Sequence, residues 1–180
     1  MMRIIAGTIA ALLLVASPVF AQDFTSNINA AASSNGVNFD TDTDEAIDAA
    51  MQDAFEAQIA AAAGVASIDD LTDEQLAAAI SGIVGNNPSL TTNQVTALVR
   101  AAASNRPTAV VQIAAAAAYA RPAISAAVQA AAISVAPTQS AAITSAVVRS
   151  AADGTAADVN QDGFVDTVEA ENPNQDASPT

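Results

Sequence analysis

The chain contains no cysteine, histidine, lysine or tryptophan. Without cysteine it forms no disulfide and has no thiol nucleophile. Without histidine or lysine it has no Ser-His-Asp triad, no Schiff-base lysine and no zinc site of the usual type. Carboxylates and hydroxyls are left for catalysis, and the acidic residues lie on polar segments. We therefore expect no enzymatic activity, with a carboxylate-dependent hydrolase as a remote alternative.

Large hydrophobic side chains are also scarce. Aromatic residues make up 3% of the chain, with one tyrosine, and most of the 52% of residues that are hydrophobic are alanine. Alanine buries little area, and burial stabilises a fold by roughly 25 cal/mol per Å². Alanine is, however, the best helix former. The composition therefore predicts a helical fold whose helices approach one another closely.

The first 21 residues have the pattern of a secretory signal peptide. Arg3 precedes an apolar stretch at residues 4–16, which is shorter than the roughly 20 residues that span a bilayer. A proline break and small residues up to Ala21 match a cleavage site. We expect the mature chain to begin at Gln22, to be periplasmic or extracellular, and to have no transmembrane segment. The alternative is a retained N-terminal anchor.

Charge is segregated along the chain, whose formal net charge is −14. Residues 23–74 hold twelve acidic and no basic residues, residues 75–152 hold four arginines and no acidic residue, and residues 153–180 hold seven acidic and no basic residues. This negative charge predicts no binding to nucleic acid. The central block is either a neutral helical domain kept apart by its acidic ends, which we favour, or a surface that packs on another copy or on the acidic flanks.

The first third of the chain predicts one helix. Residues 22–41 are polar and small, and we interpret them as a flexible acidic segment. Asp42 is expected to begin a helix through a capping box with Glu45, and Gly64 is expected to end it as a C-cap. The apolar stripe of this helix is Ile47, Met51, Phe55 and Ile59.

An internal repeat with a period of nineteen residues follows. Its frame is L-T-x-x-Q-[LV]-x-A-x-[IV] and ends in N-x-P, first from Leu71 and again from Leu90. Thr72 and Thr91 occupy the N-cap positions of the two predicted helices. A glutamine three residues later completes a capping box in each copy.

Three later prolines are spaced by fifteen residues, at Pro107, Pro122 and Pro137. Proline suits the first turn of a helix and does not continue the preceding one, so each interval predicts one helix. These helices are roughly residues 108–120, 123–135 and 138–152. The chain is therefore predicted to be all-α: an array or bundle of short, Ala-rich antiparallel helices, either a compact bundle or a solenoid-like stack, with partly disordered termini.

Residues 158–169 carry the most specific chemistry, with the sequence D-V-N-Q-D-G-F-V-D-T-V-E. Calcium takes six to eight oxygen ligands, and an EF-hand loop supplies them from positions 1, 3, 5, 7, 9 and 12, with glycine at position 6 for the sharp turn. Gly163 falls at position 6. The ligand positions fall on Asp158, Asn160, Asp162, Phe164 through its backbone carbonyl, Asp166 and Glu169.

This segment resembles an EF-hand calcium loop at every ligand position, and it is also similar to the calcium loop of dockerin modules. The resemblance implies Ca²⁺ as the ligand and covers twelve of the 180 residues. The segment departs from a full EF-hand unit, because Asp153 and Gly154 interrupt the incoming helix and Pro173 limits the outgoing one. It also lacks the second dockerin repeat. We therefore expect a structural staple or a pairing element and not a conformational calcium sensor.

A second acidic segment has part of the same spacing. Asp40, Asp42 and Asp44 occupy positions 1, 3 and 5, and Asp48 occupies position 9, but Glu45 stands at the glycine position. We interpret these acids as residues of a helix N-terminus that interact favourably with the helix dipole, with a weak metal site as the alternative. Two further acidic pairs before residue 75 are interpreted in the same way.

The expected organisation has five parts: a signal peptide at 1–21, a flexible acidic segment at 22–41, an Ala-rich helical repeat domain at 42–152, an EF-hand-like calcium loop at 153–172 and a disordered tail at 173–180. The expected function is that of an exported calcium-binding helical protein with a structural or interaction role. The alternative is a self-assembling cell-surface or matrix protein. The expected partners are calcium and either a second copy of the chain or another protein.

Overall fold

The computed structural model describes residues 19–153. Within that range every regular element is helical, which confirms the predicted all-α fold. The α-helices are α1 (Val19–Asn35), α2 (Asp44–Ala63), α3 (Asp73–Asn86), α4 (Thr92–Asn105), α5 (Val110–Ala120), α6 (Ser125–Val135) and α7 (Ser140–Asp153). Four short 3-10 turns lie between them, η1 (Ile68–Asp70), η2 (Pro107–Ala109), η3 (Pro122–Ile124) and η4 (Pro137–Gln139).

Each of the three regularly spaced prolines begins a 3-10 turn that leads directly into the next α-helix. The first of these turns closes when the N–H of Ala109 donates to the carbonyl of Arg106 at 3.0 Å, and the other two repeat this bond. Helices α5, α6 and α7 therefore begin two residues later than predicted. Proline fits this position because it lacks the N–H that a first turn leaves unpaired.

The two capping boxes of the nineteen-residue repeat are confirmed. At the start of α3, the N–H of Gln75 donates to the hydroxyl of Thr72 (3.2 Å) and the N–H of Thr72 donates back to the side chain of Gln75 (2.9 Å). Thr91 and Gln94 make the same pair of bonds at the start of α4, at the same two distances. Each box satisfies two backbone donors that a helix N-terminus leaves without a partner.

The two ends of α2 were predicted with unequal success. Its N-cap is Thr43, whose hydroxyl accepts from the N–H of Ala46, so the prediction that Asp42 caps this helix was wrong. The carboxylate of Asp42 instead accepts from the N–H of Asn38 in the preceding loop (2.8 Å). The predicted C-cap at Gly64 is confirmed, with φ of 72°, a left-handed conformation that glycine adopts without a steric penalty.

Helix α1 corrects the interpretation of residues 22–41 as a flexible segment, because it is helical to Asn35. Phe24, Ile28 and Ala32 are buried at successive four-residue steps along it. These side chains form one apolar stripe, which packs against α2. The stripe is narrow and lies among asparagine, serine and alanine, so its periodicity is easily missed in the sequence.

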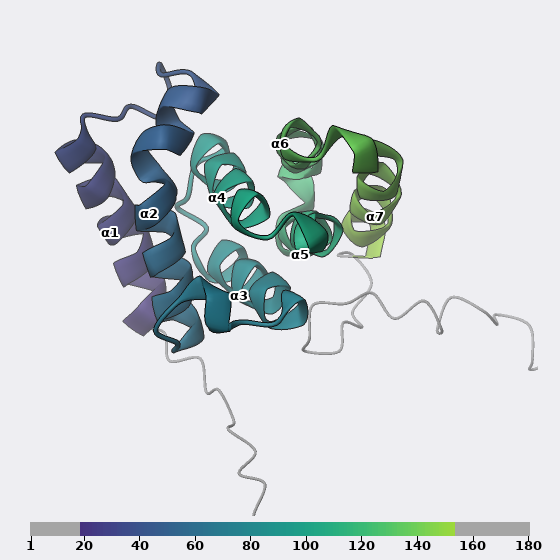
Figure 1. Ribbon diagram of the computed structural model, residues 1–180, viewed down its shortest axis with the longest axis horizontal. Coiled ribbons are helices and arrows are strands. Elements are labelled where there is room, and N and C mark those ends of the chain that lie inside the picture. The colour runs from purple at the N-terminus through teal and green to yellow at the C-terminus, as the bar shows by residue number, and fades with distance from the viewer. Residues whose placement is uncertain (1–18, 154–180) are drawn as a thin grey trace, which may run out of the picture.

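Helices α2 to α7 form two rows (Figure 1). One row is α2, α4 and α6, and the other is α3, α5 and α7, so that each helix packs on the helix two places along the chain. Helix α1 packs on α2 at the N-terminal end of the first row. This arrangement favours the solenoid-like stack over the compact bundle among the two predicted forms.

Helix α5 lies at the centre of the stack and contacts α3, α4, α6 and α7. Its alanines 114, 116, 117 and 118 are fully buried. Alanine is suited to a helix that is enclosed on several sides, because a side chain of one carbon lets neighbouring backbones approach closely. Larger buried side chains from α2, α3, α4, α5 and α7 complete the same core, among them Phe55, Met51, Leu76, Ile80, Leu98, Ile113 and Ile143.

Long polar side chains join successive helices of the same row at the helix starts. The guanidinium of Arg106, before α5, donates to the carbonyl of Leu71, before α3. Arg121, before α6, donates in the same way to the carbonyl of Leu90, before α4 (2.7 Å). Leu71 and Leu90 are equivalent positions of the repeat, so the two arginines make equivalent links between alternate helices. Gln139 extends the pattern to α7 by donating to the carbonyl of Pro107 (3.2 Å).

Replacing Thr91 by alanine is expected to lower the free energy of unfolding by about 1 kcal/mol, because the N–H of Gln94 loses its acceptor. Urea unfolding followed by circular dichroism measures this change. Thr92→Ala is the matched control: Thr92 is exposed and one residue further along, and its replacement is expected to change stability by less than about 0.5 kcal/mol. Equal effects of the two substitutions would contradict the capping role.

Candidate functional site

The predicted calcium loop lies outside the described residues. This holds for all six expected ligands, Asp158, Asn160, Asp162, Phe164, Asp166 and Glu169. The described residues end at Asp153, the last residue of α7, and the predicted loop begins five residues further along the sequence. Most of the predicted signal peptide, residues 1–18, and the predicted tail at 173–180 also lie outside the described range.

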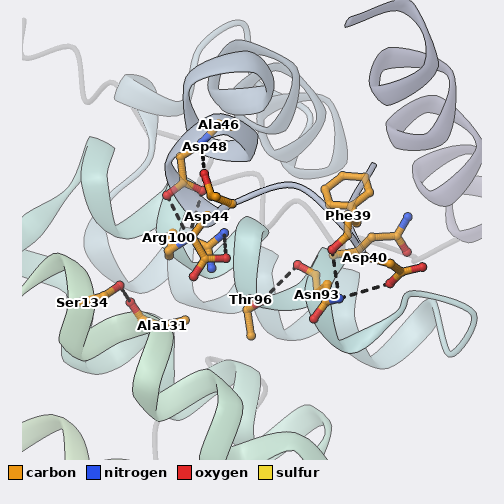
Figure 2. Close-up of polar contacts among 12 residues, drawn as sticks. Phe39, Asp40, Asp44, Ala46, Asp48, Asn93, Thr96, Arg100, Ala131 and Ser134 are labelled. Atoms are coloured by element: carbon orange, nitrogen blue, oxygen red, sulfur yellow. Dashed lines mark hydrogen bonds and ion pairs between the residues drawn. The ribbon is translucent and has the colours of Figure 1, made fainter. Parts of the chain in front are cut away.

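The second acidic segment does not converge on one point. Asp42 turns toward the backbone of Asn38, as described above, whereas Asp40 accepts from the side-chain amide of Asn93 at 3.2 Å (Figure 2). Asp44 and Asp48 turn toward α4. Among residues 19–153 there is no group of three or more histidine, cysteine, aspartate or glutamate side chains able to hold a metal ion. The structure therefore favours the helix-start interpretation of this segment.

Three pairs of acidic residues before residue 75 lie at helix starts, as predicted. They occupy the first turns of α2 (Asp44 and Glu45), η1 (Asp69 and Asp70) and α3 (Asp73 and Glu74). Asp70 also completes a capping box, because its carboxylate accepts from the N–H of Ser67 (3.1 Å). Negative charge at these positions interacts favourably with the helix dipole.

Arg100 is the only charged side chain that is buried among the described side chains, with 4% of its surface exposed. It lies on α4, and its Nε is 2.9 and 2.8 Å from the two carboxylate oxygens of Asp48 on α2. Its Nη2 lies 3.1 Å from a carboxylate oxygen of Asp44, also on α2 (Figure 2). A buried guanidinium is costly without a paired anion, so these two carboxylates are what permits arginine at this position.

The arginines of the central block therefore pair with the acidic block that precedes it. Arg106 makes a second such contact, with its Nη1 3.3 Å from the carboxylate of Asp73. Of the alternatives left open by the segregated charge, packing of the central block on its acidic flank is the one that these contacts support. Arg149, near the end of α7, is exposed.

Sequence reasoning missed the Arg100 contact. Its partners lie on another helix, 52 residues away in the case of Asp48, and no local pattern joins them. The signal that was available is indirect: Arg100 follows the apolar residues Leu98 and Val99 on a helix without any other charged residue. A single charge in such a setting indicates a buried partner on a neighbouring element.

No helix within residues 19–153 has the length and apolar character needed to span a membrane. In comparisons with known proteins, no protein family, curated protein or solved structure matches this chain.

Asp48→Asn is expected to lower the free energy of unfolding by about 2 kcal/mol, because it leaves the buried guanidinium of Arg100 without its main counter-charge. Asp44→Asn is the matched control. Asp44 contacts the same guanidinium but is 68% exposed, so its loss is expected to cost less than about 1 kcal/mol. Urea midpoints of the two variants measure the difference. If Asp44→Asn proved the more damaging substitution, Asp48 would not be the main partner.

Proposed function

We propose that this protein is an exported, calcium-binding helical protein with a structural or interaction role. The observation that carries the proposal is the segment at residues 158–169, which has an oxygen donor at all six EF-hand ligand positions and glycine at the turn. Four of the six donors are carboxylates, at Asp158, Asp162, Asp166 and Glu169. Such a set suits a hard divalent cation, and it offers neither nitrogen nor sulfur to a softer metal.

The signal-peptide pattern and the single loop support a structural role for the ion. Extracellular calcium modules bind at roughly 10⁻⁴–10⁻³ M, which suits an ion that stays bound and not one that reports a change in concentration. In the sequence Gly154 directly follows Asp153, the last residue of α7, and this glycine predicts a break in the incoming helix that an EF-hand sensor would need. Bound calcium would reduce the formal charge of the loop from −4 to −2, which lowers the repulsion when two loops from two copies meet or when one loop meets a partner protein.

Isothermal titration of the purified protein with calcium tests the proposal. We expect one ion to bind per chain, with a dissociation constant in the range of roughly 10⁻⁴–10⁻³ M. Glu169→Gln is expected to weaken binding at least about tenfold, because position 12 supplies two of the ligand oxygens. Glu171→Gln removes the same charge two residues beyond the loop and serves as the matched control, with little expected effect.

Two results would contradict the calcium assignment. One is the absence of binding heat up to a concentration well above the expected dissociation constant. The other is a binding heat that Glu169→Gln leaves unchanged, which would place any bound calcium elsewhere on this acidic chain.

A second candidate function is self-assembly, and the C-terminal end of the stack favours it. Helices α6 and α7 end the two rows. A repeat protein usually covers its terminal repeats with a polar face. Here α7 exposes Val148, which at 60% is the only large hydrophobic side chain exposed among the described residues. Two exposed residues of the same helix face, Ala141 and Ser145, are uncharged, whereas the adjacent Arg149 is exposed and positively charged.

Sedimentation velocity with and without calcium tests self-assembly. We expect a concentration-dependent dimer or larger species that Val148→Asp abolishes, because the substitution places a charge in the contact. Ala57→Asp, at an exposed position of α2 away from this end, is the matched control and is expected to leave assembly unchanged. A monomer at all concentrations, in both conditions, would rule out this candidate.

A further inference from the structure

An open pocket of about 410 Å³ lies between α1, the loop that follows it and the start of α4. A pocket of this volume is within the range of about 300–1,000 Å³ that small-molecule sites occupy. None of its residues belongs to the predicted calcium loop or contacts Arg100. The residues that line it are Asn29, Ala32 and Ser33 of α1, Val37, Asn38, Phe39 and Asp40 of the loop, and Thr91 and Gln94 of α4.

The polar groups on the α4 side of the pocket are held in fixed positions. Gln94 is buried, with 5% of its surface exposed, and its side-chain oxygen accepts from the N–H of Thr91 (2.9 Å). Its side-chain nitrogen donates to the amide oxygen of Asn29, another lining residue (2.7 Å). This bond leaves the amide nitrogen of Asn29 as the donor of that side chain. The hydroxyl of Thr91 accepts from the N–H of Gln94, so its own proton is available to an acceptor.

The opposite wall is ordered by contacts between the loop and α4. The side chain of Asn93 donates to the carbonyl of Phe39 (2.9 Å) and to the carboxylate of Asp40 (3.2 Å), which Figure 2 shows as two dashed lines from one nitrogen. The N–H of Asp40 in turn donates to the side-chain oxygen of Asn38 (3.0 Å). The wall is therefore positioned before any ligand arrives, which lowers the entropic cost of binding.

The chemistry of the lining indicates an uncharged ligand. The pocket contains no basic residue, and Asp40 together with the surrounding acidic block disfavours anions. The N-terminal amides of α4 do not offer an anion site either, because the capping box already occupies two of them. One exposed carboxylate is too little to hold a cation in water. What remains uncommitted is the amide nitrogens of Asn29 and Asn38 and the hydroxyls of Ser33 and Thr91, beside apolar surface from Val37.

We propose that this pocket binds a neutral carbohydrate of monosaccharide size. A sugar ring presents alternating hydroxyls that both donate and accept, together with an apolar face of C–H groups, and so matches the lining in both respects. The pocket is open to solvent, so water competes for every hydrogen bond and the affinity is low, with a dissociation constant on the order of 1 mM. The proposal is independent of the calcium assignment.

Nitrogen–proton correlation spectra of the purified protein, titrated with glucose and with N-acetylglucosamine in the presence of EDTA, test the proposal. At least one of the two sugars is expected to shift the backbone amides of residues 29–40 and 91–94 in a saturable manner. Glucose 6-phosphate is expected to bind at least about tenfold more weakly, because its phosphate meets an acidic surface.

Ser33→Trp and Ser34→Trp form the matched pair of variants. Both serines are exposed neighbours on α1, but only Ser33 lines the pocket. Ser33→Trp is expected to abolish the shifts by filling the mouth, and Ser34→Trp is expected to preserve them, which shows that α1 remains folded. Absence of saturable shifts with both sugars, shifts that survive Ser33→Trp, or tighter binding of the phosphorylated sugar would each overturn the proposal. Because EDTA removes calcium, none of these results depends on whether the calcium loop functions.

Discussion

Alanine buries so little surface that each helix of this protein depends on contact with several others. Helix α5 is the clearest example, because it has four fully buried alanines and contacts α3, α4, α6 and α7. A two-row stack supplies such contacts, because each inner helix touches its neighbours along the chain and the helices two places away. The bulkier side chains, such as Phe55 and Met51, are concentrated near the N-terminal end, where α1 and α2 pack as a pair. The two-row arrangement therefore keeps helices whose contact surfaces are mostly alanine close to one another.

Polar contacts at the helix starts supply the order that a small-residue core lacks. Capping boxes at Thr72 and Thr91 fix where α3 and α4 begin. Arg106 and Arg121 then bind the carbonyls of Leu71 and Leu90, so that the start of each later helix is joined to the start of the helix two places before it. Alanine faces slide past one another at little cost, whereas a hydrogen bond to a particular carbonyl specifies one register. These contacts therefore contribute more to the choice of arrangement than to the total stability.

Local chemistry made much of the fold predictable. The signals that located the helices are local: capping boxes, the proline spacing and the C-cap at Gly64. They predicted most ends of helices α2 to α7 to within about two residues. Helix α1 was missed because its buried stripe of Phe24, Ile28 and Ala32 supplies one apolar residue per turn among small polar ones. The pairing of helices in two rows was left open between two forms, since it depends on side chains that meet only in the folded chain.

The candidate sites also differ in whether their residues are close together in the sequence. The calcium loop could be proposed from the sequence because all of its expected ligands lie within twelve consecutive residues, and it stays a prediction because they lie outside the described part of the chain. Two other features could not be predicted from local sequence. Arg100 and Asp48 lie 52 residues apart in the chain, and Asn29 and Gln94, which meet at the pocket, lie 65 residues apart. The second acidic segment shows the risk of relying on spacing alone. It has part of the loop pattern, yet its carboxylates contact the backbone of Asn38, the side chain of Asn93 and the guanidinium of Arg100.

The protein thus combines a stack of helices that meet through alanine with a C-terminal segment whose sequence resembles a calcium loop, and we propose calcium binding by that segment as the central claim. A crystal structure determined in the presence of calcium tests that claim most directly. We predict one ion held at about 2.3–2.6 Å by oxygen atoms of six residues. These are Asp158, Asn160, Asp162, Phe164 through its carbonyl, Asp166 and Glu169. An ordered segment at 158–169 without an ion, or an ion held by other residues, would contradict the account.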